Sequence, residues 1–196
     1  FEKVIVLINS SRPHEVAQLK ANEKVDAILV IGEPGDNGFI AMGQILNGTV
    51  NPSGRTVDVW ATDFTTAPSY VNFNTSGVSR MASDAEGYGK YVVDGEETDT
   101  FFVQYEEGIY IGYRYYETRA YEELKADASS TWWEDNMTYT FGYGLSYTDF
   151  EWEVTPSVAE GTALTDADTL SFDVKVTNTG DVAGKEVVQL YYTAPY

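Results

Sequence analysis

Two short runs made only of apolar residues limit what the first part of the chain can fold into. They are Val4–Ile8 and Ala27–Ile31. Unbroken apolar runs of this length are typical of strands covered on both faces, as in parallel sheets. Between them, Pro13 is a helix-start signal, and we expect that helix to end near Asn22.

A glycine-rich loop at Gly32–Gly38 follows the second run. Asn37 is a suitable cap for a second helix, and Gly48 is a suitable left-handed end for it. After a turn, Arg55–Trp60 is expected to form a third strand. The order strand–helix–strand–helix–strand predicts parallel strands joined by right-handed crossovers.

The C-terminal part has another pattern, in which apolar and polar residues alternate. Alternation runs through Phe150–Val154 and Leu170–Val176, and a further strand is expected at Glu186–Tyr192. A period of two is that of a half-buried antiparallel strand. Three strands open a β-sandwich without closing it, because an immunoglobulin-like sandwich needs about seven. We therefore expect an incomplete second domain.

Residues 61–100 between these parts are rich in Ser, Thr, Asp, Asn and Gly, which predicts a long loop or insertion. The acidic stretch Asp94–Asp99 does not match the spacing of a calcium loop and is interpreted as a solvated loop. Strands are expected again at Phe101–Val103 and Ile109–Tyr116, followed by a polar stretch at 117–138.

Composition excludes several classes of partner. The 196 residues include 12 Lys and Arg against 31 Asp and Glu, a net charge of −19. Nucleic acids and anionic membranes repel such a polyanion. The absence of cysteine excludes disulfides, thiolate metal sites and cysteine nucleophiles, and the single His14 excludes a His-rich metal site within the chain. No cofactor is expected.

Few residues carry a recognisable chemical motif. The loop at 32–38 stands where phosphates often bind, but it lacks the Walker Lys and holds two carboxylates that oppose phosphate. His14 is close to Ser10 and Ser11, yet a nucleophile and its base usually come from separate elements, which favours a surface histidine. We therefore assign no catalytic, cofactor-binding or metal-binding residue in this chain.

Aromatic side chains among many acids suit sugar binding, because apolar sugar faces stack on rings. Packing of the same rings inside the protein is the alternative, and the sequence leaves both open. The candidate rings are Tyr113, Tyr115, Tyr116, Trp132 and Trp133. Four Asn-X-Ser/Thr triplets, interpreted as chance occurrences, begin at Asn9, Asn47, Asn74 and Asn136.

Four ordered blocks of the sequence together resemble one family, glycoside hydrolase family 3. The first contains Gly-Glu-Pro-Gly-Asp-Asn-Gly and Asn-Pro-Ser-Gly-Arg, and the second is similar to the family's Glu-Gly…Tyr-Arg strand. The third resembles the junction of the family's second and third domains, and the fourth the start of its fibronectin-III-like domain. The blocks are Val25–Arg55, Tyr105–Tyr116, Phe141–Phe150 and Asn178–Tyr191.

The resemblance implies an α/β three-layer sandwich with parallel strands and an antiparallel extension at residues 1–147, with 61–100 as its long loop or insertion. Residues 148–196 are expected to begin an incomplete all-β fibronectin-III-like sandwich. A chain that opens and closes on core strands is expected to be cut from a longer polypeptide. In the family, that polypeptide also contains a catalytic (β/α)8 barrel.

The family's chemistry is retaining hydrolysis of terminal β-linked sugars, with an Asp nucleophile on the barrel and, in many members, a Glu acid/base on the sandwich. We find no counterpart of either here. Glu86, in Ala85–Tyr88, faintly resembles a sequence near that acid/base but lies on the wrong side in the family order.

The chain is expected to support the barrel of a bacterial β-glucosidase, to help form the cleft for an oligosaccharide or β-glucoside, and to be inactive alone. A non-catalytic carbohydrate-binding or scaffold module is the alternative. The compartment is left open: the bacterial cytoplasm is one alternative, and the cell surface or secretion is the other.

Overall fold

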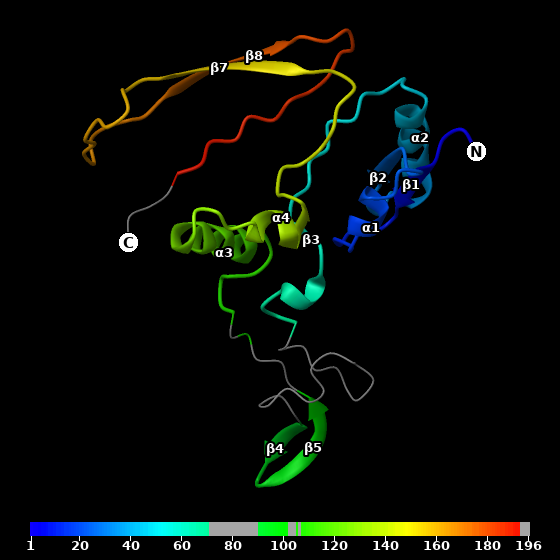
Figure 1. The fold of residues 1–196 in the computed structure, drawn as a ribbon, viewed down its shortest axis with the longest axis vertical. Coiled ribbons are helices and arrows are strands. Elements are labelled where there is room, and N and C mark those ends of the chain that lie inside the picture. Colours follow the sequence, from blue (N-terminus) through cyan, green and yellow to red (C-terminus); the bar gives the residue numbers. More distant parts are fainter. Residues whose placement is uncertain (71–89, 102–104, 106, 193–196) are drawn as a thin grey trace. The chain divides into compact units, whose positions relative to one another are not determined.

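The computed structural model describes residues 1–70, 90–101, 105 and 107–192. These residues have mixed α and β structure with four two-stranded sheets (Figure 1). Contacts divide them into two units: unit 1 is Phe1–Pro34 with Thr56–Tyr143, and unit 2 is Gly35–Arg55 with Gly144–Tyr196. The mixed α/β class is as predicted, but the described residues do not assemble a single layered sheet.

In unit 1, strands β1 (Ile5–Ile8) and β2 (Ala27–Val30) pair in parallel, with Ile5 opposite Ala27 and Ile8 opposite Val30. The two apolar runs are therefore strands, as predicted. The Asp26 carboxylate accepts a hydrogen bond from the Val4 amide at 2.7 Å, which fixes the start of the pair.

The helix between these strands is shorter than predicted, because α1 is the single turn Ala17–Lys20. Tertiary contacts hold the preceding residues out of the helix. Val16 is 2% exposed, and the neighbouring Glu15 carboxylate accepts a hydrogen bond from the Phe64 amide at 2.6 Å. Adding one turn to α1 would stabilise the chain less than these contacts do, because short helices are only marginally stable by themselves.

The strand predicted at Arg55–Trp60 is also wrong, both in the residues that it spans and in the strand with which it pairs. Strand β3 is only Trp60–Ala61, and it pairs antiparallel with β6 (Met137–Tyr139) instead of joining β2. The backbone before it is bound elsewhere. The amide of Thr56 donates to the carbonyl of Tyr143 at 2.8 Å, so these residues cannot form a ladder with β2.

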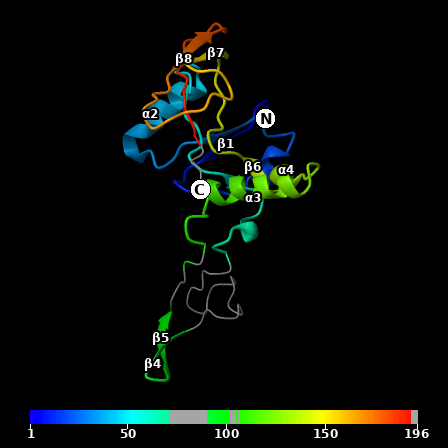
Figure 2. The ribbon, with the colours of Figure 1, turned by 90° about the vertical axis from the view of Figure 1, so that its left-hand side faces the viewer.

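The largest correction concerns Ile109–Tyr116, for which the sequence predicts a strand. The chain turns at 107–110, and helix α3 then runs over Tyr113–Ala126. It is followed by α4 (Trp132–Asn136), which contacts it (Figure 2). Tyr116 and Ala120 are the buried residues of α3, and their spacing of four is that of one helix face.

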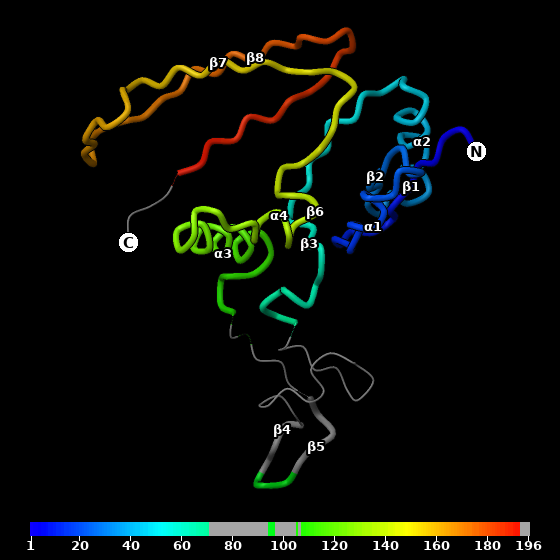
Figure 3. The backbone as a smooth tube through the Cα atoms, in the orientation of Figure 1, coloured from blue at the N-terminus to red at the C-terminus, as the bar shows by residue number. Residues whose placement is uncertain are grey.

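A hairpin replaces the predicted solvated loop at Asp94–Asp99. Strands β4 (Lys90–Val93) and β5 (Glu96–Phe101) pair antiparallel (Figure 1). The Asp94–Gly95 turn joins them, in the green segment at the β4 and β5 labels of Figure 3. Both turn residues have positive φ, 54° and 84°, as a two-residue hairpin turn requires. The rest of the strand predicted from Phe101 lies outside the described residues, as does 71–89 of the predicted loop or insertion.

In unit 2, helix α2 runs over Gly35–Leu46 and ends before Gly48, whose φ of 79° is the predicted left-handed stop. The helix begins earlier than predicted. Gly35 has a φ of 57°, so the reversal into the helix occurs there and Asn37 lies inside the first turn instead of capping it.

The alternating segments of unit 2 form the antiparallel pair β7 (Phe150–Pro156) and β8 (Phe172–Asn178), as predicted. One face of this ribbon is apolar, because Trp152 lies opposite Val176 and Val154 opposite Val174. The segment at 186–192 forms no strand and pairs with no described strand, so the prediction of a further strand there is wrong for these residues.

No helix among the described residues is long and apolar enough to cross a lipid bilayer.

Candidate functional site

The start of α3 is fixed by the carboxylate of Asp58. Its Oδ1 accepts hydrogen bonds from the amides of Val59 at 2.8 Å and Tyr113 at 2.9 Å. The residue before the helix, Gly112, has a φ of 54°, and a Cβ there would stand 2.7 Å from Asp58 Oδ1. Glycine therefore permits both the turn and the close approach of the carboxylate.

This cap directs Tyr116 into an apolar cluster. Val59, Ala61, Tyr116 and Met137 form the buried cluster of unit 1. Tyr116 is 4% exposed and its hydroxyl lies 3.0 Å from Thr66 Oγ1. Since the Thr66 hydroxyl donates to the Asp63 carbonyl, Tyr116 donates to Thr66. Burial raises the pKa of the Tyr116 hydroxyl.

The candidate sugar-stacking rings surround this cluster. Trp132 lies 6.1 Å from Tyr116 and 6.4 Å from Tyr115 between ring centroids. Tyr113 contacts Phe141 at 4.9 Å, and Trp133 packs against the same cluster. Internal packing accounts for Tyr116, and the other four rings are partly buried against the same cluster.

A pocket of about 150 Å³ lies beside the cluster. Its walls are mostly apolar. They come from the segment before α1, from β3 and its approach, from the 3₁₀ turn η1 (Phe64–Thr66) with the residues after it, and from the start of α3. Asp58, Ser69 and Tyr116 add polar atoms to the lining. Asp58 uses Oδ1 for the α3 cap, and Oδ2 accepts no hydrogen bond from a described residue.

The Ser and His residues considered as a hydrolase pair do not meet. Ser10 Oγ donates to the Arg12 carbonyl at 3.3 Å, and Ser11 Oγ donates to Glu33 Oε1 at 2.9 Å. His14 packs against Trp60 at 6.4 Å between ring centroids. The contact between Ser11 and Glu33 also engages one carboxylate of the glycine-rich loop.

The Asn-X-Ser/Thr triplets have ordinary local contacts where they are described. Asn47 Oδ1 accepts from the Thr49 amide at 2.9 Å, and Asn136 Nδ2 donates to the Trp132 carbonyl at 2.8 Å. The segment containing Glu86, like Asn74, lies outside the described residues. Among the described residues, no three His, Cys, Asp or Glu side chains form a group that could hold a metal ion.

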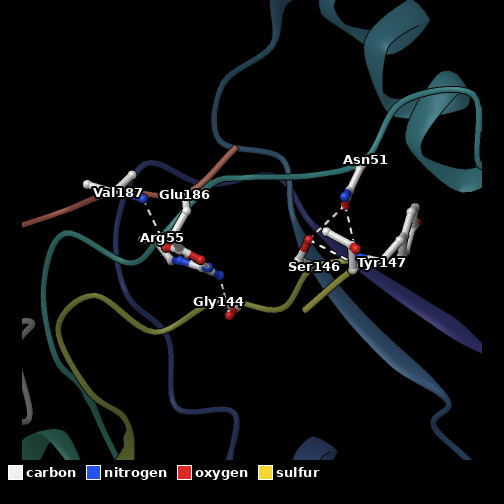
Figure 4. A network of polar contacts seen from close by, with 8 residues as sticks. Asn51, Arg55, Gly144, Ser146, Tyr147, Glu186 and Val187 are labelled. Carbon is white, nitrogen blue, oxygen red and sulfur yellow. Dashed lines mark hydrogen bonds and ion pairs between the residues drawn. The ribbon is translucent and has the colours of Figure 1, made fainter. Parts of the chain in front are cut away.

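Unit 2 contains a polar network that joins three of its segments (Figure 4). The Arg55 guanidinium forms a forked pair with Glu186, at 3.1 and 3.3 Å to the two carboxylate oxygens, and also donates to the Gly144 carbonyl. The side chains of Arg55 and Glu186 are 20% and 15% exposed, so water screens the pair only in part.

Asn51 completes this network, which we call the junction clamp. Its Oδ1 accepts from Ser146 Oγ at 3.1 Å and from the Tyr147 amide at 2.8 Å, while Nδ2 donates to the Ala183 carbonyl at 3.2 Å. Both ends of this one amide side chain are therefore used, and they bind separate segments.

Hydrogen bonds and ion pairs shift the pKa values of several carboxyl groups. Hydrogen bonding from the Val187 amide, with the Arg55 side chain also contributing, lowers the pKa of the Glu186 carboxyl. Hydrogen bonds from Thr65 lower the pKa of Asp63 in the same way. Loss of hydration beside neighbouring protein atoms raises the pKa of Glu117 on α3.

Sequence reasoning missed the roles of Asp58, Arg55 and Glu186. Asp58 interrupts an otherwise apolar stretch, Val57–Trp60, which is a usable signal for a carboxylate with a structural task. Arg55 and Glu186 lie inside the blocks that carry the family resemblance, but 131 positions separate them and no local pattern connects them.

Comparisons with known proteins agree with the resemblance. The glycosyl hydrolase family 3 C-terminal domain matches residues 1–113, more than half of the chain. Beta-glucosidase A of Butyrivibrio fibrisolvens is 34% identical over 204 residues, which take in 100% of this chain and 20% of that protein. Thermostable beta-glucosidase B of Acetivibrio thermocellus is 32% identical, over 96% of this chain and 19% of that protein.

A solved structure, that of a beta-glucosidase from Paenibacillus barengoltzii, aligns with a TM-score of 0.62 at 31% identity. The alignment covers 92% of this chain and 16% of that one. The chain thus spans about one fifth of the length of the curated relatives it matches. The prediction drawn from the four sequence blocks is confirmed: the chain belongs to glycosyl hydrolase family 3, as part of its C-terminal region.

Proposed function

We propose that this chain is a supporting part of a retaining glycosidase of the β-glucosidase type, which hydrolyses terminal β-linked sugars of oligosaccharides or β-glucosides. The names of its relatives and its family membership support a glycosidase as the parent protein. The chain supports a catalytic barrel and contributes to the substrate cleft. The parent is proposed to be bacterial.

The division of the chain is part of the same proposal. Residues 1–147 belong to the family's α/β sandwich domain, with 61–100 as a loop or insertion, and residues 148–196 begin a fibronectin-III-like domain. The antiparallel pairing of β7 and β8 supports an all-β second part. The parallel pairing of β1 and β2 supports the α/β assignment.

The observation that carries the proposal is the exposure of apolar faces that a finished fold covers. On β1, Ile5 and Leu7 are 44% and 40% exposed, although a parallel sheet normally has cover on both faces. The apolar face of the β7–β8 ribbon exposes Trp152 and Val154. A two-stranded sheet alone is marginal in water, and we propose that further polypeptide packs on these faces and stabilises them.

The catalytic pair is proposed to lie in that further polypeptide. Retaining hydrolysis needs two carboxyl groups about 5–5.5 Å apart, one acting as nucleophile and one as acid/base. Two carboxylates that the structure brings into defined contacts here have structural tasks instead: Asp58 caps α3, and Glu186 binds Arg55.

A direct test is the release of nitrophenol from 4-nitrophenyl β-D-glucoside. We expect the purified 196-residue chain to release none above a no-protein control, and the complete parent protein to turn the substrate over. Turnover by the isolated chain that survives further purification would show that the catalytic pair lies within it. A parent that cleaves no β-glycoside would remove the proposed activity.

The alternative, a non-catalytic carbohydrate-binding module, requires ring faces that a sugar can reach. Trp132 and Trp133 are the candidates, and both pack against the buried cluster of unit 1. Cellobiose titration followed by tryptophan fluorescence separates the two functions. We expect no saturable change, and saturation in the micromolar range would favour the binding module.

A further inference from the structure

The pocket beside α3 has the size and lining of a site for one small ring. It is open to solvent and measures about 150 Å³, a volume sufficient for one ring, since an enclosed apolar cavity of about 150 Å³ engineered in another protein holds benzene. Phe64, Pro13 and Pro68 contribute apolar walls. Pockets with mostly apolar walls and few polar groups are typical of small-molecule sites.

Two of the three polar side chains in the pocket lining, Asp58 and Tyr116, offer a ligand only acceptors. Asp58 Oδ2 accepts no hydrogen bond from a described residue, because the α3 cap uses Oδ1. The Tyr116 hydroxyl donates its proton to Thr66, which leaves only its oxygen lone pairs for a ligand. A ligand that places one hydroxyl or other donor near Asp58 therefore complements the pocket.

A sugar fits these features poorly. A hexose carries several hydroxyl groups, each of which costs free energy when it loses water without gaining a partner. The lining offers polar side chains only at Asp58, Ser69 and Tyr116. An aromatic ring with a single hydroxyl loses little hydration and gains contact with the apolar walls.

We propose that this pocket binds phenol-type rings, with the ring hydroxyl donating to the carboxylate of Asp58. Phenols are leaving groups of aryl β-glucosides, so the biological meaning of this ligand class rests on the proposed function. The binding of the ring does not, because it depends only on residues of unit 1.

The test titrates the 196-residue chain with phenol, benzene and glucose while amide chemical shifts are recorded by NMR. We expect saturable shifts with phenol centred on residues that line the pocket, such as Ser69 and Gly112, and none with glucose. Ala67→Phe fills the pocket from its wall and is expected to abolish the shifts. Ala126→Phe, at the far end of α3, is the matched control and should bind phenol normally.

Asp58→Asn separates the hydroxyl contact from ring burial. The amide keeps an oxygen to cap α3 but places a donor where Oδ2 stood, so phenol binding is expected to weaken about fivefold while benzene binding is unchanged. Equal phenol binding by wild type and Ala67→Phe overturns the proposal, as does glucose binding at these residues. Absence of phenol binding also overturns it but would leave the hydrolysis tests of the parent untouched, so the two failures are distinguishable.

Discussion

The interior of unit 1 and the junction clamp of unit 2 hold distant segments together by different means. In unit 1, Tyr116 and Met137 are buried with Val59 and Ala61, and water is excluded from their contacts. In the clamp, Asn51, Arg55 and Glu186 do the same task through hydrogen bonds and a partly buried ion pair. The difference shows that apolar packing holds the segments together in unit 1, which has enough residues for a core. Charged and polar contacts hold them together at the clamp, where the described residues of unit 2 form no such core.

Removal of the Tyr116 side chain should have the largest effect. We expect Tyr116→Ala to lower the free energy of unfolding by about 3–5 kcal/mol, because it leaves a cavity in the cluster. Urea unfolding followed by circular dichroism measures the change. Tyr121→Ala, on the exposed side of the same helix, should cost no more than about 0.5 kcal/mol. Equal losses in the two variants would mean that this cluster is not what stabilises unit 1.

Arg55→Met should have an intermediate effect of about 2 kcal/mol, since it leaves the Glu186 carboxylate without its charged partner. The same unfolding measurement applies. Lys175→Met is the control: it breaks an ion pair with Glu153 whose side chains are 67% and 70% exposed, and should cost about 0–1 kcal/mol. A double replacement, Arg55→Met with Glu186→Met, should recover part of the loss, because no buried charge then lacks a partner.

Lowering the pH should have the smallest effect on the stability of the fold, and we expect that effect to depend on Glu186. The pKa of Glu186 is lowered in the folded state from the ordinary value of 4.5, so the ionised group stabilises the fold above that value. This contribution is lost as the pH falls through the lowered pKa. We expect Glu186→Gln to be less sensitive to acid than wild type in unfolding experiments between pH 6 and about 3. An acid profile of Glu186→Gln that matches that of wild type would argue against the clamp as a titrating element.

The sequence predicts the parts of this fold whose pattern is local. The apolar runs at β1 and β2 and the alternation at β7 and β8 specify strands by their own periodicity, and the structure has them within about two residues. The turn at Asp94–Gly95 also has a usable local signal, because Asp-Gly is a strong hairpin dipeptide, but the surrounding acids favour the interpretation as a solvated loop.

The rest depends on contacts between residues far apart in the sequence. The tyrosines at 113–116 have high strand propensity, and they are helical because Asp58, 55 positions earlier, caps the Tyr113 amide. Likewise, the roles of Arg55 and Glu186 exist only once two distant segments meet. The family could be predicted from sequence blocks, whereas the residues that organise the pocket and the clamp could not be predicted from spacing.

Thr56 gives a last consequence, for how the length of this protein can change during evolution. Its amide and hydroxyl donate to the carbonyls of Tyr143 and Thr140, and its carbonyl and hydroxyl oxygens accept from the amides of Gly142 and Tyr143. Thr56 and Tyr143 are 87 positions apart in the sequence, so these hydrogen bonds close a long loop of the chain. The entropic cost of closing a loop grows only with the logarithm of its length, by about 0.6 kcal/mol of free energy for each doubling. Stretches that take no part in the buried cluster of unit 1 can therefore be added or lost between these residues at little thermodynamic cost, provided that the hydrogen bonds of Thr56 are kept.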